Sequence, residues 1–307
     1  MEGDLRTAAD ELADSVVVCG VGECGDALAT RAFRNARIVP TAAVADGVSS
    51  GVAAVLVAVD PSEPDDVVAR LRAFADIDAF TVALIPDGGG ATDAVWAIRD
   101  HVDGLLLVAT GAGDGSAAER VDGSRTDTDG GSRTDGDVVA DGVREFLDIV
   151  QAPGFVNLDL TDARTVLSSG IAALGSGSAA RDAPAAAVEA SFARLPDDVD
   201  PSDASAVLVD VVVDPDTSIT AATDAIAAVR DRIVPEANVI WGGAVDDAAA
   251  DELTVRTVVA DVRYAPRLAA GDPCPRCGSP LSTYAFGASE TLACDGCGYS
   301  GIAVRRE

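Results

Sequence analysis

Four cysteines near the C-terminus have the spacing of a metal site. Cys274 and Cys277 form one C-x-x-C pair, Cys294 and Cys297 form another, and sixteen residues separate the two pairs. This spacing is typical of zinc ribbons, in which four thiolates hold a structural Zn²⁺ and leave no open catalytic position. A glycine follows each pair, and a turn there can bring backbone N–H groups near the sulfurs. A rubredoxin-like iron site and a redox pair are the alternatives.

A second pattern combines an amide with two carboxylates in the stretch 153–162, PGFVNLDLTD. Its polar side chains are Asn157, Asp159 and Asp162. If Asp159 caps a helix, it and Asp162 face one side of the first helical turn, where they could orient a water or hold a cation. The simpler interpretation is an N-cap followed by a first-turn acid that complements the helix dipole.

A glycine-rich turn follows the first buried strand and precedes a helical stretch that runs to about residue 33. Strand, glycine turn and helix in this order aim backbone N–H groups at a phosphate. The turn contains Gly20, Gly22, Cys24 and Gly25. The next buried strand, 53–59, leads instead into DPSEPDD, where two prolines lack N–H groups and four acids oppose an anion.

The remaining pattern predicts an α/β protein in two halves. Strands alternate with helices up to residue 108, which indicates a doubly wound, mostly parallel sheet. Residues 110–135 are rich in Gly, Ser, Asp and Thr and predict a flexible loop. Apolar spacing over 137–150 predicts a long linking helix. Late strands, including 206–213 and 238–245, predict an α+β second half with a mixed sheet.

The strand and helix pattern suggests three parts of the chain. We expect a first domain at 1–150, a second at 151–265 that includes the loop 153–162, and a zinc ribbon at 270–307. The ribbon has few basic residues, which favours docking to a protein over binding to nucleic acid.

The net charge of −29 indicates a cytosol of high salt. All 22 basic residues are arginines, and 51 acidic residues oppose them. High salt screens the self-repulsion of such a surface, so the acidity need not indicate a basic partner. It argues against broad nucleic-acid binding. The absence of an apolar stretch of membrane-spanning length predicts a cytoplasmic protein without a membrane segment.

Several segments resemble the FtsZ/tubulin superfamily. PGFVNLDLTDARTVL, at 153–167, is similar to the synergy loop of that family, which joins its two domains. Similar matches follow at 173–191 and 237–259, and weaker ones occur upstream in GVGECGDAL and HVDGL. The resemblance is strong over 137–262 and weak before it.

This resemblance implies a GTP site and a filament interface. By position, Gly20, Gly22, Cys24, Gly25 and Asp137 match nucleotide-binding residues. In the family the synergy loop acts on the nucleotide of the next subunit, which implies catalytic roles for Asn157, Asp159 and Asp162. The family's second glycine cluster, G-G-G-T-G-[ST]-G, is replaced by DPSEPDD, and Gly136 stands where a base-reading asparagine usually precedes Asp137.

We therefore expect a divergent member of this family with a degenerate nucleotide site and a fused zinc ribbon. It would be a non-hydrolysing interaction or regulatory partner in a cytoskeletal or cell-division system, and its partner would be a protein such as a filament subunit of the family. Self-association is a further expectation. One alternative is an active GTPase that binds GTP and polymerises. The other is a zinc-ribbon adaptor on an inert α/β scaffold.

Overall fold

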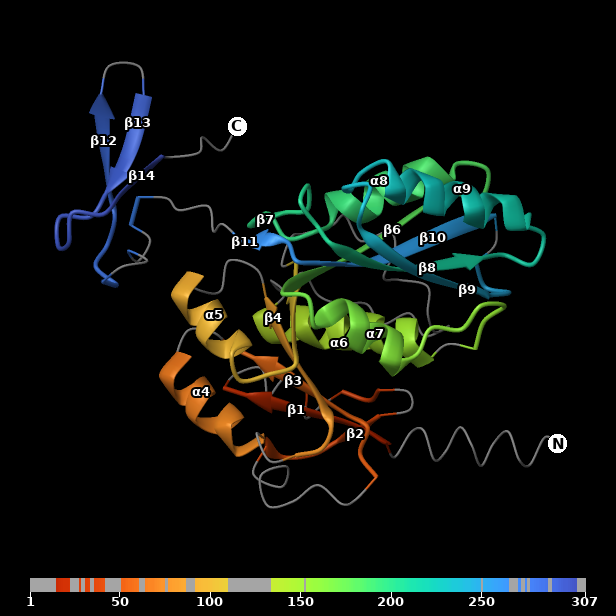
Figure 1. The fold of residues 1–307 in the computed structure, drawn as a ribbon, viewed down its shortest axis with the longest axis horizontal. Coiled ribbons are helices and arrows are strands. Elements are labelled where there is room, and N and C mark those ends of the chain that lie inside the picture. The colour runs from red at the N-terminus through yellow and green to blue at the C-terminus, as the bar shows by residue number, and fades with distance from the viewer. Residues whose placement is uncertain are drawn as a thin grey trace.

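A nine-stranded mixed sheet forms the centre of the molecule in the computed structural model, with the order β2–β1–β3–β4–β5–β6–β10–β8–β9 (Figure 1). The structure describes residues 15–22, 28, 31–33, 36–41, 51–60, 64–74, 77–86, 92–109, 134–151, 153–249, 251–264, 270–271, 274, 277–286 and 289–302. The predicted flexible loop at 110–135 lies outside these residues up to 133.

The first half of the sheet is entirely parallel. Its strands are β1 (Val16–Val21), β2 (Arg37–Ile38), β3 (Ala54–Val59), β4 (Phe80–Pro86) and β5 (Gly104–Val108). Runs such as AVLVAV in β3 are apolar throughout because helices cover both faces of the sheet. On one face lie α4 (Pro64–Leu71), the 3₁₀ turn η1 (Arg72–Phe74) and α5 (Thr92–Arg99).

The opposite face is covered by two helices that precede the second half. The predicted long helix is α6 (Asp135–Gln151), which buries Val139, Val143 and Phe146 at helical spacing against β3, β4 and β5. After the loop, α7 (Leu160–Leu167) packs against β8 and β10 on the same face of the sheet as α6. The chain between these two helices is the stretch 153–159, so both of its ends are held by buried helices.

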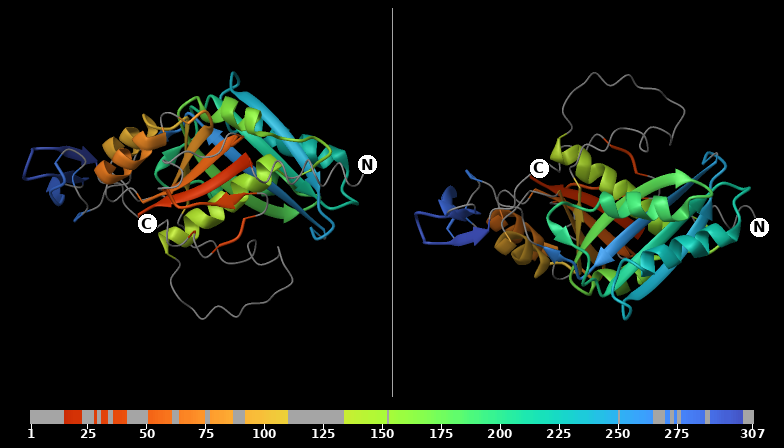
Figure 2. Two further views of the ribbon diagram at one scale, coloured as in Figure 1. Left: turned by 90° about the horizontal axis from the view of Figure 1, so that it is seen from below. Right: turned by 90° about the horizontal axis from the view of Figure 1, so that it is seen from above.

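The second half adds four strands to the same sheet. These are β6 (Ile171–Ala180), β8 (Ala206–Val213), β9 (Asn238–Val245) and β10 (Glu252–Ala260), and β10 runs antiparallel between β6 and β8. Helices α8 (Pro184–Ala193) and α9 (Ile219–Arg230) cover one face (Figure 2). A separate pair joins β7 (Val199–Asp200) to β11 (Arg263–Tyr264). The predicted mixed sheet is confirmed.

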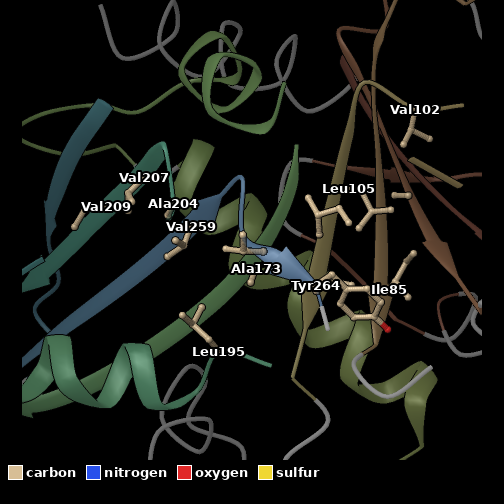
Figure 3. Packing of buried hydrophobic residues seen from close by; sticks show 14 of the residues in the cluster. Ile85, Val102, Leu105, Ala173, Leu195, Ala204, Val207, Val209, Val259 and Tyr264 are labelled. Carbon is tan, nitrogen blue, oxygen red and sulfur yellow. The ribbon is translucent and has the colours of Figure 1, made fainter. Parts of the chain in front are cut away.

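The two halves share one sheet and one core. Strand β5 pairs in parallel with β6, from Leu105 opposite Ile171 to Val108 opposite Leu174. Figure 3 shows Ile85 and Leu105 of the first half in the same apolar cluster as Ala173 and Val259 of the second. The sheet and its core therefore continue across residue 150, where the sequence predicts a domain boundary.

An arginine reinforces this junction. Arg99, at the end of α5, donates hydrogen bonds to the carbonyl oxygens of Val102, Ser168 and Gly170 at 2.8, 3.3 and 3.1 Å. Three backbone carbonyls at the ends of α5, α7 and the start of β6 are thus satisfied by one side chain.

The C-terminal residues form a small unit apart from the sheet (Figure 1). It contains β12 (Ser282–Phe286), β13 (Ser289–Ala293) and β14 (Ser300–Ile302), paired antiparallel in that order. Among the residues whose burial is described, its core consists of Cys274, Leu281, Leu292 and Cys294, with Cys297 and Tyr299 packed against them. In the described part of the chain, no helix has the length and apolar character needed to cross a membrane.

Candidate functional sites: a four-cysteine centre and a capped acidic loop

The four predicted cysteines come together at one end of the ribbon. The sulfurs of Cys274 and Cys297 are 3.6 Å apart, those of Cys277 and Cys294 are 3.4 Å apart, and all four lie within 4.8 Å of one another. These separations are far longer than the ~2.05 Å of a disulfide bond. They approach the roughly 3.8 Å expected between thiolates around a tetrahedral metal with bonds of about 2.3 Å.

Two identical turns place the cysteines. In each turn the first cysteine N–H bonds to a carbonyl five residues on: Cys274 to Ser279, and Cys294 to Tyr299, both at 2.8 Å. The glycine after each pair returns a bond to the first cysteine carbonyl. Gly278 and Gly298 have φ of +73° and +71°, which L-residues with side chains rarely adopt. The two turns therefore require glycine at these positions, because the backbone there has a positive φ.

Backbone N–H groups favour thiolate in this cluster. Hydrogen bonds from Ser279 lower the pKa of Cys277 to about 6. For Cys297 the N–H of Tyr299 also lowers the pKa, but burial and the other three sulfurs outweigh it and raise the pKa to about 12. Without a cation, the cluster thus resists holding four negative charges, and a divalent metal would remove this repulsion.

The donor set fits a structural metal ion. Cys274, Cys277, Cys294 and Cys297 would be its ligands, and four protein ligands fill a tetrahedral site without leaving a position for substrate. The geometry suits Zn²⁺ and also the rubredoxin-like iron alternative, because both ions accept four thiolates. Such a site supplies folding energy rather than catalysis.

The loop 153–162 lies along the edge of β9. Val156 and Gly243 exchange two backbone hydrogen bonds, at 2.9 and 3.3 Å. Gly154 must lack a side chain, since a Cβ there would stand 2.1 Å from the carbonyl oxygen of Gly243. The Asn157 side chain accepts a hydrogen bond from Gly154 N–H at 2.7 Å. The asparagine therefore shapes the turn that leads into α7.

Asp159 and Asp162 form a capping box at the start of α7. Asp159 Oδ1 accepts from the N–H groups of Thr161 and Asp162, at 2.7 and 3.0 Å, and Asp162 Oδ2 accepts from Asp159 N–H at 3.1 Å. The helix-capping interpretation of the spacing is thus confirmed. Among the described residues, the second oxygen of each carboxylate accepts no hydrogen bond, and Asp159 is exposed.

Asp137, the predicted base-reading residue, is engaged by the protein itself. Arg31 donates to its Oδ1 in an ion pair, and Thr134 donates to its Oδ2 through N–H and hydroxyl at 3.2 and 2.9 Å. Asp137 N–H in turn donates to the Thr134 hydroxyl, so the pair forms a second capping box, at the start of α6. The hydrogen bonds from Thr134, and then Arg31, lower the pKa of Asp137.

An acid also lies beside the predicted phosphate turn. Gly22 has φ +76°, and a Cβ built there would stand 3.2 Å from the Asp60 side chain, at the end of β3. Gly20 belongs to β1, whereas Cys24 and Gly25 fall outside the described residues. A carboxylate in this position would oppose the negative charge of a phosphate.

Sequence reasoning missed Arg31 and Thr134 as determinants of this region. Arg31 is 106 positions from Asp137, and nothing local to either residue marks them as partners. Thr134 could have been found, because Thr134-Asp135-Gly136-Asp137 has the spacing of a capping box before an apolar helix.

Comparison with known protein families matches residues 170–263 to the model described as FtsZ family, C-terminal domain. Cell division protein FtsZ 1 of Halobacterium salinarum is 38% identical over 128 residues, which cover 41% of this chain and 32% of that protein. Cell division protein FtsZ of Haloferax mediterranei is 35% identical over 128 residues, covering 41% and 34%. The chain thus matches about a third of the length of these curated relatives.

Solved structures resemble the fold over more of the chain. "FtsZ dimer, empty (M. jannaschii)" has a TM-score of 0.64 at 16% identity and covers 89% of this chain and 98% of its own. "CetZ2 from Haloferax volcanii - GTPgS bound protofilament" has a TM-score of 0.55 at 17% identity, covering 82% and 94%. At such identities the likeness concerns the fold alone.

The parallel sheet continues into a mixed sheet, with a long helix and a capped loop between its two halves, and this fold resembles that of the FtsZ and CetZ structures. Residues 170–263 match the C-terminal domain of the FtsZ family, and the fold of the chain resembles that of FtsZ. Its acidic, lysine-free composition fits relatives from halophilic archaea.

Proposed function

We propose that this chain is a cytoplasmic FtsZ/tubulin-like protein of a cytoskeletal or cell-division system that does not hydrolyse GTP itself. It would bind a filament subunit of the same family through the face that carries the loop 153–162. The four-cysteine ribbon would hold Zn²⁺ and dock to protein rather than nucleic acid.

The observation that carries the proposal is the state of Asp137. Both of its oxygens are occupied, by Arg31 on one side and Thr134 on the other. Guanine recognition by this carboxylate would require breaking a charge-assisted pair and a helix cap together. Asp60 beside Gly22 adds repulsion where phosphates would lie. These contacts support a degenerate site.

The loop supports the interaction part of the proposal. Asp159 and Asp162 each keep one carboxylate oxygen without a hydrogen bond from the described residues. Nearby apolar side chains are also exposed, Phe155 by 41% and Val245 by 52%. Exposed apolar side chains beside oriented carboxylates suit contact with another protein surface. There, Asn157, Asp159 and Asp162 would act on a nucleotide held by the neighbour.

Equilibrium binding of labelled GTP in molar KCl tests the degenerate site. We expect no saturable binding at micromolar GTP by the purified chain. Micromolar binding with turnover, or pelleting that depends on GTP, would instead establish the active, polymerising GTPase.

The loop is tested by adding the chain to an FtsZ-family filament protein from the same cell and measuring the filament protein's GTP hydrolysis. Asp159→Asn keeps the helix cap, because asparagine caps as well as aspartate, but removes the charge. We expect wild type to change the hydrolysis rate and Asp159→Asn to change it less. Equal effects of the two proteins would reject a chemical role for Asp159.

A ribbon adaptor on an inert scaffold is the second candidate. The separate core of the ribbon favours it, since a unit that packs on its own can bind a partner independently. Removing residues 270–307 should then abolish capture of the partner, while Asp159→Asn leaves capture unchanged. The leading proposal expects capture without the ribbon.

A further inference from the structure

Strand β9 is one end of the nine-stranded sheet and carries no charged residue. Its sequence is NVIWGGAV, and β8 is its only partner among the described strands. Edge strands are usually protected from unwanted pairing by charges, prolines or bulges. In a chain with 51 acidic residues, an edge of eight residues without charge is the exception.

Val239 and Trp241 of β9 direct their backbone N–H and C=O groups away from the sheet. Asn238 N–H bonds to Ser205, which precedes β8, at 2.9 Å, whereas Gly243 bonds to Val156 on the outer side. Backbone direction alternates along a strand, so Val239 and Trp241 share the outward direction of Gly243. Within the described part of the chain, their N–H and C=O groups have no backbone partner.

The open part of this edge has defined limits. At its C-terminal end, Val156 covers Gly243, and Leu158 packs on Gly242. At its N-terminal end, Ala237 N–H bonds to Val234 and turns the chain away from the edge. The unpaired part of the β9 edge is therefore about 238–241, and its length suits pairing with a short strand from another chain.

We propose that a second copy of this chain occupies this edge, with the two β9 strands antiparallel and centred on Ile240. In that register Val239 of each copy faces Trp241 of the other. Both residues direct their backbone outward, so each such pair exchanges both of its N–H···O=C bonds. The contact is isologous, because the same residues serve on both sides.

The side chains agree with this register. Val239 and Trp241 are half-buried on the face that α9 covers, and Ile240 is half-buried on the other face. Across the contact, tryptophan would pack on valine twice and isoleucine on isoleucine once. Aromatic and β-branched pairs of this kind stabilise antiparallel strands.

Charge decides when the contact forms. The strand itself is neutral, but Glu236 and Asp246 lie just outside its two ends, and the whole chain is strongly negative. Two copies therefore repel at low salt. The Debye length falls from about 10 Å at 0.1 M to about 3 Å at 1 M, which removes this repulsion and leaves the apolar and backbone contacts. The dimer is thus expected at molar salt.

Sedimentation equilibrium of the full chain at about 0.1 M and 3 M KCl tests the proposal. We expect a monomer at low salt and a concentration-dependent dimer at high salt. Val239→Pro removes an outward N–H that β8 does not use, and should raise the dimer Kd more than tenfold. Val239→Thr keeps the N–H and the β-branched shape, and should leave the Kd within about threefold of wild type.

A cross-link fixes the register. Ile240 faces itself in a non-hydrogen-bonded pair, where Cα atoms lie about 4.5 Å apart and a disulfide can form. Ile240→Cys should give a covalent dimer under mild oxidation, and Val239→Cys should not.

Three outcomes would overturn the proposed β9 dimer. A monomer at 3 M KCl overturns it, as does a dimer that Val239→Pro leaves intact. Binding of an unrelated extended peptide to β9 without self-association would also overturn it. Because nothing in it depends on nucleotide or on Asp159, its failure is distinguishable from failure of the proposed function.

Discussion

Individual carboxylates in this chain are used first to hold helices in place. Asp159 and Asp162 form one capping box and Thr134 and Asp137 another, and these boxes begin α7 and α6. Residues that could do chemistry are therefore also residues that position the chain. Separating the two roles requires variants that keep the cap while changing the charge.

Replacing Asp159 with alanine should destabilise the protein by about 1 kcal/mol, the usual cost of losing an N-cap. Two N–H groups at the start of α7 would lose their acceptor. Chemical denaturation at fixed high salt measures the loss. Ser169→Ala, exposed beyond the end of α7, is the control and should change stability little. Equal stability of Asp159→Ala and wild type would show that the box contributes nothing.

Asp210 has a different role, because it is buried on the sheet. It lies on β8 with 5% of its side chain exposed and pairs with Arg256 of β10 at 3.2 Å. Burial raises its pKa to about 6, against the attraction of Arg256, and nearby Asp148 raises it further. Glu145 on α6, also near Arg256, has a raised pKa because of burial.

The raised pKa of Asp210 predicts a pH dependence with a definite sign. Its unfolded pKa is about 3.9, so the folded state binds this proton more tightly. The resulting stabilisation is complete below about pH 4 and is lost as the pH rises to about 6, with a magnitude on the order of 2–3 kcal/mol. Asp210→Asn removes the proton site. The unfolding free energy of wild type minus that of Asp210→Asn should fall between pH 4 and 6, and a flat difference contradicts the assignment.

At the scale of elements, several segments follow from the sequence because their cause is local. The apolar spacing over 137–150 predicted α6, and the runs AVLVDVVV and NVIWGGAV predicted β8 and β9 with their observed ends. The cysteine cluster was predictable because spacing within the ribbon almost determines it. The pairing of β5 with β6 was not, since it joins residues on either side of two helices. The pairing of Arg31 with Asp137 could not be predicted either, because the two residues lie 106 positions apart in the sequence.

The ribbon should fold only with its metal. In its described part the core has two buried leucines and two buried cysteines, and burying a leucine contributes about 1.5–3 kcal/mol. Ordering each residue costs about 1.5 kcal/mol, so this core cannot order β12, β13 and β14 without metal. A strong chelator should therefore release one metal ion and remove hydrogen-exchange protection from these strands.

Protection in β1 to β10 should survive that treatment, because the sheet has its own core. Cys294→Ser should reproduce the loss of metal. Cys19→Ser is the matched control: Cys19 is buried in β1, where burial raises its pKa to about 12, and it should leave the metal content unchanged. A ribbon that stays protected without metal would contradict the argument.

At the scale of the whole molecule, the net charge and the apolar core have opposite effects on the stability of the fold. The chain carries −29, while its sheet is buried between two apolar clusters. A compact state concentrates that charge, which destabilises it, and the apolar core offsets the repulsion. The balance between the two depends on the ionic strength.

Thermal stability should accordingly rise with KCl in two phases. Up to about 1 M, screening shortens the Debye length to about 3 Å and removes most of the repulsion, so Tm should rise steeply. Beyond that, the gain should flatten, because KCl is a weak excluder and screening is already complete. Circular dichroism melts in KCl measure the curve, with sucrose as the control that is excluded without screening. If sucrose at low salt restored the same Tm as molar KCl, repulsion between the acidic side chains would not be what limits this fold.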